Sequence, residues 1–525
     1  MIGILFSDAS AEAGKYVLAA VQRSVSTTQA QSVSRSTLRS TACSVIVAVD
    51  VPDEWGTELL EWLRNKPCKL LVFGRMPTAL AQHLNYRETE FQPDLGGASR
   101  SDSTPSRESR ESRAVVRYTS LVKTLGGREW QRPFERFDFT DEWNNLGFGA
   151  IRADGSIWAV TQAAQVPPEA ELASVQVAGE HQFSYAAVWD TDPAGVLWFN
   201  RPVGPCDSFE WRTVENFLSS YRAQSLPCHP VLSELPWGYD AAITSRLDCD
   251  EDVESARPLW QTYQRLGVPF TLAVHTQNLS RTEHHGILRE LLADREQGAV
   301  LSHTATHAPN WGGSYNTALE EGSQSAALLQ GVTGNPVRYA VSPFHQSPPY
   351  AMRALADAGY EGCIGGIIRN DPEFLTARGG VLAGIPSGFV GHSQQCMLHG
   401  DCMLKEGDPL AVFKQAFDLA YETNTLFGYL DHPFSERYQY GWPDEALRIE
   451  AHEQFIAYMK GRARKPLFMN EEVALDFLKF KSLTQVFEED GVFSVRTPSG
   501  GAMRLTLGVE FRGMHVQVEA GKPLQ

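Results

Sequence analysis

Residues 241–252, AAITSRLDCDED, and residues 299–307, AVLSHTATH, decide the fold of this chain. Each begins with a short apolar run typical of a buried strand and ends in charged or histidine side chains. Helical patterns follow both segments, and strands and helices then alternate up to a last clear strand at residues 426–430. The alternation includes a helix expected at residues 281–297 and a strand expected near Ile385. This alternation predicts a (β/α) barrel, in which functional residues lie at the carboxyl ends of the strands.

The sequence before the barrel has a different pattern. Short β-branched runs alternate with helical patterns, which is typical of an α/β layer. Strand-like segments follow, among them a hairpin expected at residues 150–159 around Asp154-Gly155. The runs expected as strands of the layer are residues 2–6, 44–50 and 69–74, and the expected helices are residues 11–23 and 58–65.

Two further segments complete the expected organisation. Residues 98–113, ASRSDSTPSRESRESR, contain no apolar residue after the first alanine, so we expect a flexible loop there. After residue 466, segments that alternate apolar and polar residues predict a small antiparallel sheet. We therefore expect an N-terminal α/β domain with β-rich additions over 1–225, a barrel over 226–465 and a small β domain over 466–525.

Composition limits the classes of function. Of the 525 residues, 42% are hydrophobic and 21% are charged, as in ordinary globular proteins. The net charge of −17 repels phosphate backbones, so nucleic acid is not an expected partner. The start of the sequence has no signal-peptide pattern, no apolar run could span a bilayer, and the eight cysteines form no CxxC pair. We expect a cytoplasmic protein.

Three groups of polar side chains lie at expected strand ends. His303 and His307 are four residues apart, and on one helical turn two such imidazoles can bind one divalent ion; the alternative is a pair of surface or capping histidines. Asp248 and Asp250 belong to an acidic run that partly suits a helix N-terminus, but Asp248 continues an apolar strand. His432 follows the last strand.

This order of motifs resembles the polysaccharide deacetylase superfamily, the family-four carbohydrate esterases and their relatives. His303-Thr-Ala-Thr-His307 matches the motif H-[ST]-x-x-H, and Leu430-Asp-His432 matches L-x-H. Ser342-Pro343-Phe344 is similar to the R-x-P-[FY] turn, with Val341 in place of the arginine. Cys249 separates two aspartates that are adjacent in the family. The resemblance covers about residues 241–445 and implies a distorted (β/α) barrel.

The resemblance implies a metal-dependent hydrolase that removes an N-acetyl group from an amino sugar. Asp250, His303 and His307 would bind a divalent ion, and Zn²⁺ is the ion we expect first. Asp248 would be the base and His432 the acid, and either Arg246 or Arg338 could replace the missing arginine. The expected substrate contacts are Pro343, Phe344 and Trp311.

Several alternatives stay open at this point. The substrate could be a surface glycan or a lipid- or nucleotide-linked precursor, as in O-antigen synthesis, and the acyl group could be formyl. A non-catalytic glycan-binding protein with a decayed esterase barrel is the other class. The N-terminal part is similar, at the level of the fold alone, to class I glutamine amidotransferases but has no cysteine in a glycine-flanked turn. A scaffold, substrate-positioning or homo-oligomer role is expected for it.

Overall fold

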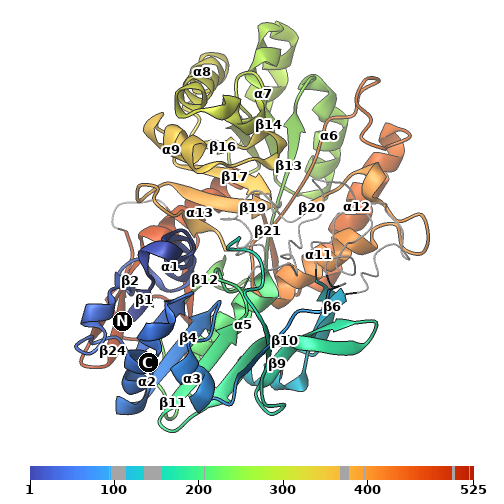
Figure 1. Cartoon of the computed structure of the whole chain (residues 1–525). Helices are drawn as coiled ribbons and strands as arrows, with labels where there is room; N and C mark the ends of the chain where they lie inside the picture. Colours follow the sequence, from blue (N-terminus) through green and yellow to red (C-terminus); the bar gives the residue numbers. More distant parts are fainter. Residues whose placement is uncertain are drawn as a thin grey trace.

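The protein has an α/β fold with two large sheets, which form the lower and upper halves of Figure 1. The computed structural model describes residues 1–93, 95, 114–134, 156–205, 207–366, 378–394, 396–498, 503–519 and 521–524. The loop expected at 98–113 and the Asp154-Gly155 turn lie outside the described residues. Residues 156–159 form a turn in place of the second strand of the expected hairpin.

The lower half is built on a nine-stranded sheet. Its strands are β1 (Ile2–Leu5), β2 (Ala30–Val33), β3 (Val45–Val49), β4 (Cys68–Phe73), β6 (Ala114–Tyr118), β7 (Trp130–Pro133), β9 (Glu171–Val177), β10 (Glu180–Asp190) and β11 (Ala194–Phe199). Their order is β2-β1-β3-β4-β11-β10-β9-β6-β7, with the first five parallel and the rest antiparallel. A separate pair joins β5 (Arg87–Thr89) to β8 (Ala163–Gln165).

Helices cover both faces of the parallel part of this sheet, because successive strand side chains point to opposite faces. Ile2 and Ile4 pack in one core with residues of the helix at Ala11–Val25, on one face of the sheet. Leu5 and Ile46 pack in a second core with residues of the helix at Gly56–Asn65, on the other face. The helices of this half are α1 (Ala11–Val25), α2 (Gly56–Asn65), α3 (Thr78–His83) and α5 (Ser208–Ser219).

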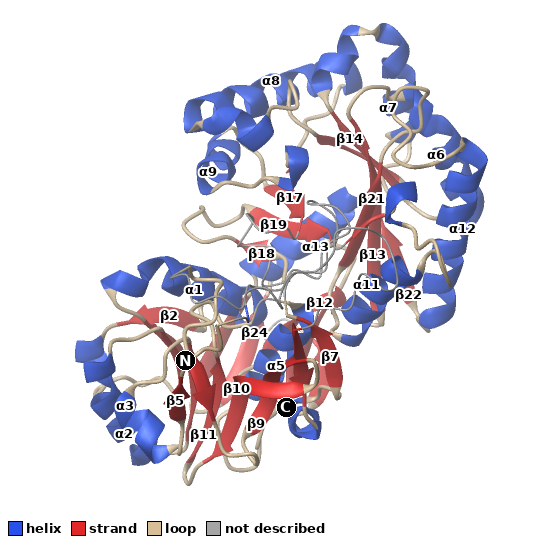
Figure 2. Ribbon diagram, turned by 45° about the vertical axis from the view of Figure 1, so that its right-hand side comes forward, coloured by secondary structure: helices blue, strands red, loops and turns tan. Residues whose placement is uncertain are grey.

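The upper half is built on a ten-stranded sheet with helices around it, most clearly seen in Figure 2. Its strands are β13 (Ala241–Cys249), β14 (Phe270–Val274), β15 (Gly298–Ser302), β16 (Tyr339–Val341), β17 (Gly362–Gly366), β18 (Gly380–Val381), β19 (Val390–Gln394), β20 (Cys396–Met397), β21 (Phe427–Asp431) and β22 (Pro466–Met469). Its helices are α6 (Arg257–Leu266), α7 (His285–Leu291), α8 (Tyr315–Thr333), α9 (Pro349–Asp357), α11 (Ala411–Glu422), α12 (Glu445–Arg462) and α13 (Glu471–Leu483).

The strands of this sheet run parallel, apart from the short antiparallel β18. The order is β18-β19-β17-β16-β15-β14-β13-β21-β20, and β22 also pairs with β13. The two ends of this order approach each other, since a Cβ placed on Gly428 of β21 would lie 3.6 Å from the Cα of Gln394 in β19. The carboxyl ends of β13, β15 and β21 therefore face a common space.

One expected boundary and the expected C-terminal sheet differ from the structure. Residues 241–244 of β13 pair with residues 466–469 of β22, so the sheet of the upper half extends beyond the predicted limit at residue 465. The C-terminal segments form two small sheets rather than one. The first joins β12 (Val231–Pro236) to β25 (Leu507–Phe511) and β26 (Met514–Gln517), and the second joins β23 (Gln485–Glu489) to β24 (Val492–Arg496).

Two local predictions were also wrong. The strand expected near Ile385 is a turn between β18 and β19. The helix expected at 281–297 is reduced to α7, because a turn in which Gln297 donates to the Asp294 carbonyl follows it.

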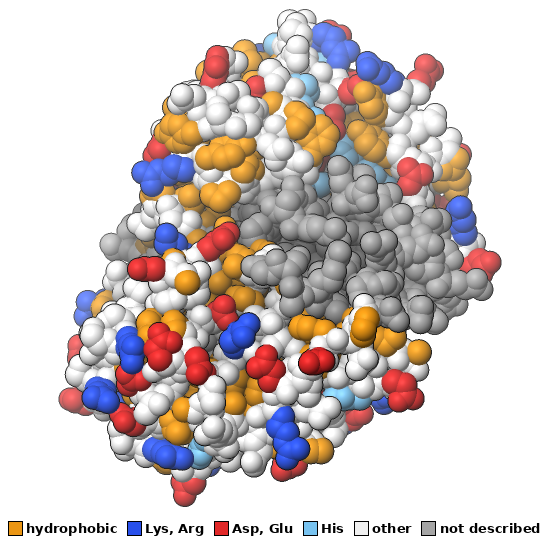
Figure 3. All heavy atoms as spheres, in the orientation of Figure 1, with side chains coloured by type: hydrophobic (Ala, Val, Ile, Leu, Met, Phe, Trp, Pro, Cys, Tyr) orange, Lys and Arg blue, Asp and Glu red, His pale blue; other side chains and the backbone are white. Residues whose placement is uncertain are grey.

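The helices, the surface charges and the cysteines of the described residues bear on membrane spans, charged patches and disulfides. Within the described residues, each helix is too short or too polar to cross a bilayer. On the face in Figure 3, acidic and basic side chains are interspersed over the lower half. The seven cysteines in the described part of the chain are buried free thiols.

Candidate active site

A cavity of about 410 Å³ lies at the carboxyl ends of the strands of the upper half. This is where ligand sites occur in such folds, and its volume suits a small molecule. Histidines and carboxylates dominate its wall. The titratable residues that line it are Asp248, Asp250, Glu251, His275, His303, His307, His345, His432, Tyr438 and Tyr440.

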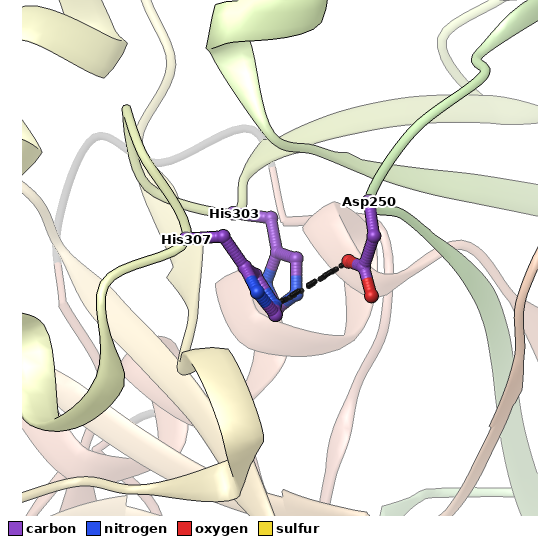
Figure 4. A group of neighbouring side chains, drawn as sticks. All are labelled: Asp250, His303 and His307. Atoms are coloured by element: carbon purple, nitrogen blue, oxygen red, sulfur yellow. Dashed lines mark hydrogen bonds and ion pairs between the residues drawn. The ribbon is translucent and has the colours of Figure 1, made fainter.

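Asp250, His303 and His307, which we call the Asp250 cluster, converge on one point in this cavity (Figure 4). The Oδ1 atom of Asp250 lies 3.2 Å from Nε2 of His303 and 3.4 Å from Nε2 of His307. The two Nε2 atoms are 3.1 Å apart. Asp250 directly follows β13, and His303 directly follows β15, so two parallel strands on either side of β14 bring these ligand atoms together.

The segment 303–307 is a loop and not the helical turn that the spacing suggested. Thr304 and His307 have left-handed backbone angles, with φ of 69° and 54°. The Thr304 hydroxyl accepts a hydrogen bond from the His307 backbone, and Glu321 of α8 accepts from the backbones of Ala305 and Thr306. These bonds hold an unfavourable backbone shape that turns both imidazoles toward Asp250.

The donor set fits a divalent cation. The Oδ1 atom of Asp250 is buried and has no hydrogen-bond donor among the described residues. His303 places Nδ1 3.1 Å from the Val341 carbonyl, which favours a proton on Nδ1 and leaves Nε2 with a lone pair. Burial lowers the pKa of His307 to about 4, so this ring is neutral near pH 7. Two imidazoles and one carboxylate match the ligands of catalytic zinc sites.

Asp248 lies beside this cluster and is paired with an arginine from its own strand. Arg246 Nε lies 2.6 Å from Asp248 Oδ1, and both side chains are buried. Burial raises the pKa of Asp248, but the Arg246 charge outweighs it and holds the pKa below its usual value. Arg246 also contacts Glu471 of α13 at 3.1 Å and Gln394.

Of the two candidate arginines, Arg246 is the one that pairs with Asp248. Arg338, the other candidate, is engaged elsewhere, with ion pairs to Asp476 at 2.6 Å and Glu472 at 2.7 Å. Burial raises the pKa of Glu471 to about 7 despite the Arg246 charge. Of the two carboxylates on Arg246, Asp248 therefore makes the shorter contact, and it is the one whose pKa is lowered.

His432 reaches the same cavity from the end of β21. Its Nε2 lies 3.5 Å from Oδ2 of Asp250, and its ring stacks on Tyr440 with centroids 4.0 Å apart and planes at 11°. The preceding residue, Asp431, points to the other side of the strand, where Arg448 and His452 of α12 donate to it at 2.7 and 3.0 Å.

A second group of ligand-type atoms consists of Asp431, His399 and His432, which we call the Asp431 cluster. Its members are all buried. Its carboxylate differs from Asp250 because donors already surround it: besides Arg448 and His452, the His432 backbone donates at 2.7 Å. The adjacent guanidinium makes this a poor place for a cation.

The expected substrate contacts are distributed unevenly. Phe344 lines the cavity, is partly exposed and packs its ring 4.5 Å from that of His307. Pro343 is buried in the turn and does not line the cavity. Trp311 is fully buried and donates its indole N–H to the Gln346 carbonyl, so its prediction as a substrate contact was wrong. An indole packed in the core of α8 and α9 is out of reach of a ligand.

Sequence reasoning missed four residues of this site: His275, His345, His399 and Tyr440. His275 holds the Asp250 carbonyl through Nδ1 at 2.9 Å. His345 is buried with no partner for Nδ1 among the described residues. His345 directly follows the Ser342-Pro343-Phe344 turn, and His275 directly follows an apolar strand, so both positions were available signals. His399 and Tyr440 follow no motif.

Comparison with known proteins gives low-identity matches only. No family model matches the chain, and no curated protein matches it. Among solved structures, a putative polysaccharide deacetylase from Mycobacterium smegmatis is 14% identical, with 47% of this chain and 92% of that one covered and a TM-score of 0.37. A family-four acetyl xylan esterase from Clostridium thermocellum, in complex with cobalt, is 14% identical, with 45% and 91% covered and a TM-score of 0.30.

A third similar structure is a family-four pseudoenzyme from Bacillus anthracis, 13% identical, with 45% of this chain and 65% of that one covered and a TM-score of 0.30. Each of these three structures covers less than half of this chain. Both catalysts and a pseudoenzyme occur among these neighbours.

Proposed function

We propose that this protein is a metal-dependent carbohydrate N-deacetylase of the polysaccharide deacetylase superfamily, with the ten-stranded sheet as its distorted (β/α) barrel. The observation that carries the proposal is the Asp250 cluster: a buried carboxylate oxygen without a donor among the described residues, facing two imidazole nitrogens. Its position beside Asp248 and His432 in one cavity supports a hydrolytic role.

Hydrolysis of an amide needs an activated water, a polarised carbonyl and a proton for the leaving amine. A divalent ion bound by Asp250, His303 and His307 would supply Lewis acidity for the water and the acyl oxygen. The Asp248 carboxylate, kept ionised by Arg246, accepts the proton of the water. His432 then gives a proton to the nitrogen as the C–N bond breaks, so that acetate and a free amino sugar leave.

The substrate side of the proposal rests on the cavity. Phe344 and Tyr438 offer aromatic faces on which a sugar ring can stack, and the cavity volume admits one acylated sugar unit. We propose a surface glycan or a lipid- or nucleotide-linked precursor as the substrate and Zn²⁺ as the resident ion, in a cytoplasmic protein.

The proposal is tested by the release of free amine from N-acetylated and N-formylated amino sugars, as monomers, nucleotide sugars and oligosaccharides, with and without chelator. Asp248→Asn should keep the metal and lower turnover by roughly 10²–10⁴-fold, the range for one lost acid–base group. Asp252→Asn, which changes a carboxylate outside the cavity, is the matched control and should keep full turnover. Metal-loaded protein that releases no amine from any of these sugars contradicts the proposal.

A further inference from the structure

A second histidine contacts the ring that we assign as the acid. Nε2 of His399 lies 2.8 Å from Nδ1 of His432, and both rings are buried. His399 follows β20 and is not among the residues that line the cavity, so it can act on a substrate only through His432. Nothing in the motifs of the sequence pointed to it.

The ring of His432 is fixed on three sides. Tyr440 covers one face, Nε2 points toward Asp250, and Nδ1 points toward His399. Orientation of an acid–base histidine through the nitrogen away from the substrate is a general requirement of such catalysis, and a carboxylate is its usual agent. Here the atom at that position is an imidazole nitrogen.

The carboxylate that lies in the same cluster as His399 and His432 already has several hydrogen-bond donors. Asp431 accepts hydrogen bonds from Arg448, His452 and the backbone of His432, and its Oδ1 is 3.5 Å from His399 Nε2. Burial, followed by the charge of His432, holds the pKa of His399 well below its usual value. The His399 ring is therefore neutral and can offer Nε2 as an acceptor.

We propose that His399 is the positioning residue of His432: its Nε2 accepts a hydrogen bond from the Nδ1–H of His432, so that the Nε2–H of His432 faces the cavity. This inference rests on the proposed function for its consequence in catalysis. The contact itself belongs to the fold and can be tested without turnover.

Close backbone contacts at Gly400 and Gly441 join the segments that carry His399 and Tyr440, the two residues that contact the ring of His432. The Gly400 N–H donates to the Tyr440 carbonyl at 3.0 Å, and a Cβ on Gly441 would lie 2.2 Å from the backbone nitrogen of Asp401. Gly441 also has a left-handed φ of 74°. The turn that carries His399 and the loop that carries Tyr440 are thereby closely packed around the ring.

The test compares His399→Leu with His399→Gln, whose side-chain amide can restore a hydrogen bond to Nδ1. In the metal-loaded full chain, His399→Leu should lower amide turnover by about 10–100-fold and His399→Gln by much less. Hydrolysis of an activated acetate ester, whose leaving group needs no proton, should change little. In a His432→Ala background, His399→Leu should cause no further loss. Equal losses on amide and ester, or loss of the metal, contradict the proposal.

A second measurement separates this inference from the proposed function. The imidazole ¹⁵N signals of His432 report the hydrogen bond at Nδ1, and they should move in His399→Leu and return toward the wild type in His399→Gln. Unchanged signals in His399→Leu overturn the positioning role whatever the activity. A wild type that hydrolyses neither substrate, with His432 signals that respond to His399, contradicts the proposed function alone.

Discussion

The Asp250 cluster and the Asp431 cluster each contain one aspartate and two histidines. Their aspartates lie at the ends of the adjacent strands β13 and β21, yet the hydrogen-bond partners of the two carboxylates differ. In the first, a buried carboxylate oxygen has no donor among the described residues. In the second, the carboxylate accepts from an arginine, a histidine and a backbone N–H.

This difference distinguishes the Asp250 cluster, a candidate cation site, from the Asp431 cluster, whose carboxylate fixes neighbouring side chains. Buried polar atoms normally have hydrogen-bond partners, so a buried carboxylate oxygen without a donor indicates a site for a cation. A carboxylate beside a guanidinium has no such requirement, and its bonds serve to fix the surrounding side chains. The contacts of each carboxylate, more than its residue type or strand position, indicate its role.

The largest effect is expected from breaking the Asp250 cluster. Asp250→Asn removes the charge that balances a divalent ion, so the protein should lose its metal and at least about 10⁴-fold in amide turnover, the several kcal/mol that a Lewis acid supplies. Elemental analysis and amine release measure the two quantities. Double replacement of His303 and His307 by alanine should also remove the metal, and full occupancy in that variant would refute the ligand assignment.

A smaller and different effect is expected from the Asp431 cluster. Asp431→Asn leaves Arg448 buried with less negative charge around it, which should cost about 3–5 kcal/mol of stability while the folded fraction keeps its metal. Urea unfolding followed by circular dichroism gives the stability, and elemental analysis gives the metal. An unchanged unfolding midpoint together with metal loss would mean that the two clusters have exchanged roles.

The smallest effect concerns the pH dependence of metal binding. Burial lowers the pKa of His303, but the Asp248 and Asp250 carboxylates outweigh it and raise the pKa above the ordinary 6.5. Because a protonated imidazole cannot bind a metal, affinity should fall by about tenfold per pH unit once the pH drops below that raised pKa.

The same reasoning gives a sharper comparison between variants. Asp248→Asn removes one charge that raises the pKa of His303. Its affinity should therefore begin to fall at a lower pH than in the wild type, as titrations with a competing chelator would measure. A loss that begins at the same pH in both proteins would show that Asp248 does not act on His303.

Much of the fold could be predicted because its strands are short, apolar and separated by helical patterns. The strand ending at Cys249 and the strand before His303 were found from their β-branched and apolar runs. β22 could not be found in this way, since Pro466–Met469 is four residues long and its pairing with β13 depends on a contact more than two hundred residues apart.

In the candidate site, too, local sequence patterns predicted some residues, and tertiary contacts alone place the others. His303 and His307 belong to a motif with fixed spacing, and Asp250 belongs to an acidic run at an expected strand end, so all three could be named as candidates in advance. Arg246 could be suggested but not chosen over Arg338, because only the sheet decides which guanidinium meets Asp248. His399 and Tyr440 reach His432 through tertiary packing, which leaves no local pattern.

The pairing of β22 with β13 has a consequence for anyone who wishes to isolate the upper half. A fragment over residues 226–465 would leave residues 241–244 of β13 without their β22 partner, and exposed unpaired strand backbone promotes aggregation. It would also lack Glu471, the second carboxylate on Arg246. The smallest fragment that keeps the cavity intact therefore has to include α13, so the upper half cannot be excised at the boundary that its motifs suggest.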